Sequence, residues 1–198
     1  VRRPPGSTLC PYTTLFRSDF VVGKIARLFE LKGHDDLFAI APRLAKRIPN
    51  IRFLLVGDGV WRGRFERLAK EIGCDQNFIF TGLVPPSEIP SLVGVMDALV
   101  HLSRREGLPR ALPQAMAAAK PVVAFDCDGA GEVCLDGKTG HLIEPGDLPK
   151  LEERLAKLAN DAPLRTALGQ AGRKVVEEEF TVEQLVERQY ELYKRLLT

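Results

Sequence analysis

The chain has 198 residues, of which 45% are hydrophobic and 27% are charged, a composition typical of a globular protein. Its 28 basic and 26 acidic residues nearly cancel. The resulting net charge of +2 excludes the strongly one-signed field of a non-specific nucleic-acid binder. We therefore expect no nucleic-acid partner, whereas binding of a small anionic ligand is compatible with this charge.

No apolar run approaches the roughly 20 residues that span a bilayer. Four cysteines without a Cys-x-x-Cys spacing are typical of a reducing compartment, so the expected location is cytoplasmic. Arg43, Lys46 and Arg47 lie close together on one predicted helix. They leave a peripheral contact with the inner membrane face as an alternative to an ordinary solvated surface.

Residues 1–18 mix Pro, Gly, Thr and Arg without periodicity and lack the apolar core of a signal peptide. Part of this stretch, PYTTLFRS, also resembles the translation of a sequencing-adapter oligonucleotide. We expect residues 1–18 to be foreign or disordered, and residues 19–198 to form one domain.

Apolar runs bounded by turn residues predict six strands, with amphipathic helices between them and a helical C-terminus. The predicted strands cover residues 19–26, 51–56, 78–80, 98–102, 121–125 and 140–143. Pro42 is expected to kink the first helix or split off its first turn, and Ser87 to cap the third. This alternation predicts an α/β fold, a Rossmann-like parallel sheet with helices on both faces.

The loops that follow the strands carry most of the candidate chemistry, and in a parallel sheet they meet at one edge. The first loop holds Arg27 and Lys32, a pair of cations suited to a diphosphate. The fourth loop leads into a helix that Pro113 places near Arg110, whose free N–H groups would attract an anion. The alternative for the two cations is ordinary surface charge.

Other residues of these loops have equally plain alternatives. Glu106 before a helix is commonly a cap, and Gln114 a surface residue. His101 in an apolar strand is more often a hydrogen-bonded core residue than a catalyst, and the three histidines show no metal-ligand spacing. The sequence lacks the G-x-G-x-x-G and P-loop motifs, which argues against a dinucleotide oxidoreductase or a P-loop NTPase.

From Asp19 to Thr198 the chain resembles the C-terminal, donor-binding half of the GT-B glycosyltransferases of family 4, retaining enzymes that use nucleotide-activated sugars. The resemblance rests on an ordered series of short motifs. These are GKIARL with KGH at residues 23–34, LVGDG at 55–59, FTGLV at 80–84, EGLP at 106–109, AMAAAKPVV at 115–123, GAGEV at 129–133 and DGKTG at 136–140.

The resemblance implies the roles of the site residues. Arg27 and Lys32 would bind the donor diphosphate, and Glu106, the first Glu of an E-x7-E motif, would meet the donor sugar. The backbone from Gly107 through Leu108 and Pro109 to Arg110 would meet sugar and phosphate. Residues Gly82, Leu83 and Val84 would bracket the base, with Gly57 and Asp58 completing the donor site. The resemblance implies no metal and no cofactor beyond the nucleotide sugar.

The sequence departs from the family at Gln114, mildly at Ala119, where the family often has Gly, and upstream of Asp19. Gln114 occupies the position at which the second Glu of E-x7-E accepts hydrogen bonds from the ribose hydroxyls. This replacement predicts a roughly tenfold weaker affinity for the donor. The acceptor-binding N-terminal domain has no counterpart upstream of Asp19. We therefore expect a truncated chain that binds donor weakly and transfers nothing, because transfer needs both reactants positioned.

Completed, the protein is expected to move a sugar from a nucleotide diphosphate sugar to a glycan or lipid-linked acceptor. A non-catalytic nucleotide-binding module, which Gln114 favours slightly, and a GT-B nucleotide-sugar epimerase are the alternatives.

Overall fold

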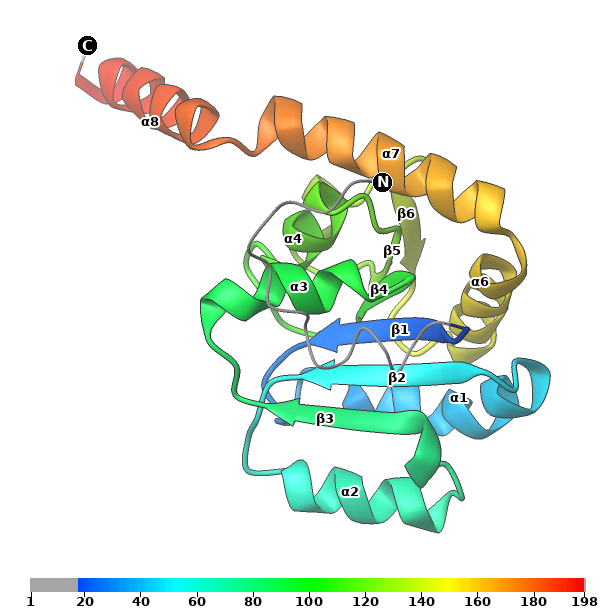
Figure 1. Cartoon of the computed structure of the whole chain (residues 1–198). Helices are drawn as coiled ribbons and strands as arrows, with labels where there is room; N and C mark the ends of the chain where they lie inside the picture. The colour runs from blue at the N-terminus through cyan, green and yellow to red at the C-terminus, as the bar shows by residue number, and fades with distance from the viewer. Residues whose placement is uncertain (1–17, 198) are drawn as a thin grey trace.

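A computed structural model of the chain describes residues 18–197 and shows one six-stranded sheet (Figure 1). Residues 1–17, nearly all of the predicted foreign segment, lie outside the described part. The sheet order is β3-β2-β1-β4-β5-β6, and every neighbouring pair of strands is parallel. The strands are β1 (Phe20–Ile25), β2 (Ile51–Val56), β3 (Phe78–Gly82), β4 (Ala98–His101), β5 (Val122–Phe125) and β6 (Gly140–Ile143). The predicted α/β fold is confirmed.

Helices cover both faces of this sheet, as a parallel sheet requires. They are α1 (His34–Arg47), α2 (Arg62–Glu71), α3 (Ile89–Gly94), α4 (Ala111–Ala117), α5 (Ala130–Val133), α6 (Leu148–Asn160), α7 (Ala162–Glu179) and α8 (Val182–Leu197). One apolar cluster joins a face of the sheet to α1, α2 and α6. A second cluster joins the other face to α3, α4, α5 and the end of α7.

The predicted cap of α3 is wrong, and of the two alternatives predicted for Pro42, a kink or a split, the structure excludes the split. Ser87 does not cap α3, because Pro86–Glu88 forms a short 3-10 turn and α3 begins at Ile89 after Glu88. Helix α1 continues through Pro42 without splitting. Leu37, Ile40 and Leu44 are fully buried on both sides of that proline, and their packing outweighs the one backbone hydrogen bond that it removes.

The predicted helical C-terminus is confirmed as α6, α7 and α8. Helix α7 packs on α4 and α6, whereas α8 extends away from the body of the domain and buries none of its residues (Figure 1). Among the described residues, no helix combines the length and the apolar character that crossing a membrane requires.

Candidate functional site

The first strand-end loop is tied to the loop after β2 by backbone hydrogen bonds. The Leu28 N–H donates to the Asp58 carbonyl (3.0 Å), and the Trp61 N–H donates to the Leu28 carbonyl (3.1 Å). The loop closes at Gly33, which has a φ of +63° and lies against the Leu102 carbonyl. These contacts hold the loop at Leu28, which follows Arg27, and at Gly33, which follows Lys32.

A cavity of about 460 Å³ opens at the carboxyl ends of β1 and β4. It brings together seven of the predicted site residues: Arg27, Lys32, Val84, Glu106, Leu108, Arg110 and Gln114. Lys32 and Glu106 among them lie more than seventy residues apart in sequence. Ile25, Ala26, Pro86, Ile89, His101 and Ala111 complete its lining. The cavity thus joins three cations to one carboxylate and one amide.

Glu106 is held by a network inside this cavity. Its Oε2 accepts from the Lys32 ammonium and lies 3.0 Å from the Ser103 hydroxyl. Partial burial by itself would raise the pKa of Glu106. The hydrogen bonds from Lys32 and Ser103 and the positive charge of Lys32 outweigh burial and lower this pKa. Glu106 is therefore a carboxylate at neutral pH, neutralised by a residue that also faces the cavity.

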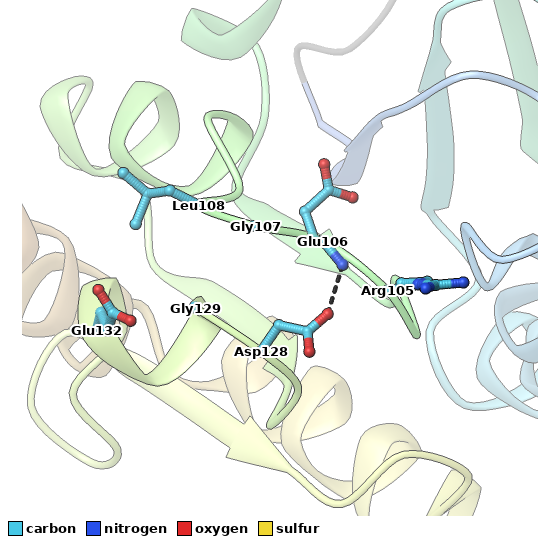
Figure 2. A pocket seen from close by; sticks show the side chains of 7 residues that line it. All are labelled: Arg105, Glu106, Gly107, Leu108, Asp128, Gly129 and Glu132. Atoms are coloured by element: carbon cyan, nitrogen blue, oxygen red, sulfur yellow. Dashed lines mark hydrogen bonds between the residues drawn. The ribbon is translucent and has the colours of Figure 1, made fainter.

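A second cavity, of about 560 Å³, lies beside the Glu106 loop (Figure 2). Asp128 lies in the segment that follows β5. Its carboxylate accepts a hydrogen bond from the Glu106 backbone N–H at 2.6 Å and so joins this segment to the Glu106 loop. Gly129 approaches so closely that a Cβ there would lie 2.5 Å from the Gly107 carbonyl oxygen. Asp128 and Gly129 therefore set the position of the Glu106 backbone, a role that the sequence analysis missed.

A buried polar cluster lies beneath the cavity. Lys24 of β1 is 2% exposed, and burial lowers its pKa to about 7 against the attraction of Asp36 and Glu106. Asp36 accepts two hydrogen bonds from the Arg104 guanidinium. Burial, with the charge of Lys24, lowers the pKa of His101 to about 4. Both histidine and lysine lie inside predicted strands, where periodicity marks only burial.

The remaining predicted residues lie around the cavity without lining it. Gly57 and Asp58 contact the first loop, and Gly82 lies beside the Arg62 guanidinium. Leu83 is exposed, Pro109 is buried, and Gly107 lines the second cavity. Their predicted roles in donor binding stay predictions.

The helix mouth predicted near Arg110 is present, because Arg110 is the N-cap of α4 and Pro113 lies in its first turn. Helix α4 has only seven residues, so its dipole contributes little and the cations Arg27, Lys32 and Arg110 dominate the positive field. Among residues 18–197, no cluster of three or more His, Cys, Asp or Glu side chains could hold a metal ion.

Two glycosyltransferases are similar to this chain in amino-acid sequence. The chain is 32% identical over 160 residues to the GDP-mannose-dependent alpha-(1-6)-phosphatidylinositol monomannoside mannosyltransferase of Mycolicibacterium smegmatis, covering 77% of this chain and 42% of that protein. It is 31% identical over 182 residues to the 2-deoxystreptamine glucosyltransferase of Streptomyces kanamyceticus, covering 89% and 46%. The chain thus spans less than half the length of these relatives.

Solved structures share its fold. The chain superposes on Anabaena HepE in complex with UDP-glucose with a TM-score of 0.83 at 25% identity, covering 93% of this chain and 51% of HepE. It also superposes on the C-terminal domain of the group 1 glycosyl transferase LpcC from Francisella tularensis, with a TM-score of 0.76 at 25% identity, covering 82% and 87%. The fold is that of the C-terminal domain of GT-B glycosyltransferases.

Residues 13–175 match the family described as glycosyl transferases group 1, a range that includes all six strands and both cavities. The chain therefore belongs to the glycosyl transferases group 1 family.

Proposed function

We propose that this chain is the donor-binding domain of a retaining family 4 glycosyltransferase, which moves a sugar from a nucleotide diphosphate sugar to a glycan or lipid-linked acceptor. The observation that carries the proposal is the single cavity in which Arg27, Lys32 and Arg110 face Glu106 and Gln114. Three cations suit a diphosphate, and a carboxylate beside an amide suits hydroxyl groups.

In this proposal Arg27 and Lys32 neutralise the diphosphate as it leaves, which stabilises the charge that develops in the transition state. No metal is needed for that step. Glu106 orients the donor sugar, and the backbone from Gly107 to Arg110 contacts sugar and phosphate. Gln114 accepts hydrogen bonds from the ribose hydroxyls as a neutral group, which predicts weaker donor binding than a carboxylate would give.

The remaining length of the relatives would supply the acceptor site. Because positioning both reactants contributes roughly 7–11 kcal/mol to lowering the barrier, we propose that the 198-residue chain alone binds donor and transfers no sugar. The full protein would act in the cytoplasm, on an acceptor held against the edge of the sheet where the strands end.

Titration calorimetry with UDP, GDP, UDP-glucose and GDP-mannose tests donor binding. These four probes follow from HepE, whose structure contains UDP-glucose, and from the GDP-mannose-dependent relative. Arg27→Ala and Lys32→Ala should each weaken binding of the preferred nucleotide about tenfold or more, because each removes a charge-assisted hydrogen bond of about 1.5–3 kcal/mol. Lys46→Ala, on an exposed turn of α1, should leave binding unchanged.

Binding that is the same in all three variants would refute the assignment of Arg27 and Lys32. Transfer and stereochemistry need the full-length protein, and a donor-derived product whose anomeric configuration matches the donor supports a retaining transferase. A full-length protein that binds nucleotide without turnover would favour a binding module, and a changed free nucleotide sugar would favour an epimerase.

A further inference from the structure

His101 is a buried polar residue, and one of its ring nitrogens has no hydrogen-bond partner in the described part of the chain. It is the last residue of β4, only 7% of it is exposed, and among residues 18–197 its Nε2 has no hydrogen-bond partner. A buried nitrogen left unpaired is unfavourable, so its presence calls for a reason. His34 and His141 also have an unpaired nitrogen, but neither lines the donor cavity, whereas His101 does.

Three charged groups surround His101. Lys24 on β1 and Lys32 in the first loop lower the pKa of His101 through their charges, and Glu106 in the loop that follows β4 raises it. Burial and the two lysines keep the imidazole neutral at physiological pH, so it carries a single N–H. Glu106 is the one anion of the three, and the two side chains line the same cavity. The neighbour that an imidazole N–H can serve here is therefore the Glu106 carboxylate.

The present partners of Glu106 are not all secure during donor binding. Lys32 holds the carboxylate in the unliganded chain, and the proposed function assigns the same ammonium to the donor diphosphate. Ser103 has one hydroxyl hydrogen, and its Oγ also lies within hydrogen-bond distance of the Leu31 and Arg105 carbonyls, at 3.2 and 3.1 Å. When the diphosphate attracts Lys32, Glu106 needs another donor to keep its place.

We propose that His101 is a positioning residue for Glu106, whose carboxylate accepts the His101 N–H once a donor diphosphate has drawn Lys32 away. This inference rests on the proposed function. Lys24 is the competing donor, but it is 2% exposed, does not line the cavity, and has Asp36 as its principal charge partner. His101 thereby keeps Glu106 directed at the sugar while Lys32 serves the phosphates.

The first test needs no donor. Lys32→Ala imitates the withdrawal of the ammonium, and ¹⁵N NMR titration of the 198-residue chain then reads the pKa of His101. We expect this pKa to be at least one pH unit higher in Lys32→Ala than in Lys32→Ala/Glu106→Gln, since both variants lack Lys32 and only the first retains the carboxylate. His141 on β6 serves as an internal control. Equal His101 values in the two variants would overturn the proposal.

The second test separates the sugar from the phosphates. His101→Phe keeps a ring of similar size without a nitrogen, and His101→Gln keeps an N–H. We expect His101→Phe to weaken binding of UDP-glucose or GDP-mannose at least fivefold more than it weakens binding of the matching diphosphate, because only the nucleotide sugars also need Glu106 in place for the sugar. His101→Gln should recover most of the loss. An equal loss for UDP and UDP-glucose, or for GDP and GDP-mannose, would mean that His101 does not direct Glu106 at the sugar and would overturn the proposal.

Lys24→Met completes the comparison. If it reproduces the sugar-selective loss and His101→Phe does not, Lys24 is the positioning residue and the assignment to His101 is wrong. If the wild-type chain binds none of the four nucleotides, the proposed function fails, and the NMR comparison still decides whether His101 pairs with Glu106.

Discussion

Gly33 offers a direct test of how the first loop is built. An alanine at this position is destabilised in two ways. It must adopt a φ of +63°, which is strained for a residue with a side chain, and its Cβ would lie 1.9 Å from the Leu102 carbonyl oxygen. Gly73 is the matched control, because its φ is +68° and nothing lies within 4 Å of a Cβ there. Gly73→Ala should cost about 1–2 kcal/mol of unfolding free energy from backbone strain alone. Gly33→Ala adds about 1–3 kcal/mol of overpacking against a rigid backbone atom.

Urea unfolding followed by circular dichroism measures this difference. With a slope of about 2 kcal/mol per molar urea, the midpoint of Gly33→Ala should lie about 0.5–1.5 M below that of Gly73→Ala. Effects of alanine on the unfolded chain are common to both variants and cancel. Equal midpoints would refute the argument that the Leu102 carbonyl requires glycine at position 33. Because Lys32 adjoins Gly33, nucleotide binding should also weaken in Gly33→Ala and not in Gly73→Ala.

Three further changes test the site and its support. Gln114→Glu should tighten nucleoside diphosphate binding about tenfold by calorimetry, since a carboxylate forms the stronger bond to a ribose hydroxyl, and an unchanged Kd would place Gln114 away from the ribose. The folded-state pKa of Lys24 is about 7 against 10.5 unfolded, so between these values the unfolded chain binds the extra proton and stability rises with pH. Lys24→Met should flatten that rise by up to about 1.4 kcal/mol per pH unit in urea titrations at pH 7.5–9, and parallel profiles would contradict the lowered pKa. Arg104→Ala should cost about 1–3 kcal/mol of unfolding free energy, because it leaves Asp36 buried without its guanidinium. Arg173→Ala, at an exposed position of α7, should cost under about 0.5 kcal/mol in the same assay.

The sheet was predictable because parallel strands that are buried on both faces consist of continuous apolar runs in the sequence. Ile51–Val56 is such a run, and β2 has these bounds. The meeting of Arg27 with Glu106 and Gln114 followed from the rule that the carboxyl ends of parallel strands share an edge. Periodicity and topology thus predicted which loops form the cavity.

The supporting residues were not predictable in this way. Asp128 has a φ of +49°, and its carboxylate accepts from the backbone N–H of Glu106, 22 residues earlier in the chain. Neither feature produces a periodic pattern in the sequence. His101 was correctly predicted to be buried, but within the described part of the chain the expectation that it is hydrogen-bonded was wrong for its Nε2, because burial alone does not tell which cavity a ring borders. Ser87 was assigned a cap from residue type, and the backbone instead formed a 3-10 turn at Pro86.

The ion pair between Lys32 and Glu106 has a consequence for which anions the chain accepts. An incoming anion must compete with a carboxylate that is already in place, and taking Lys32 leaves that carboxylate without its countercharge. Inorganic phosphate and sulfate present no hydroxyl group to Glu106 in return. A ligand that also presents hydroxyl groups to Glu106 restores its hydrogen bonds. Under the proposed function, the resting site therefore favours a ligand that carries an anionic group and hydroxyl groups on one molecule, and simple anions are poor competitors for it.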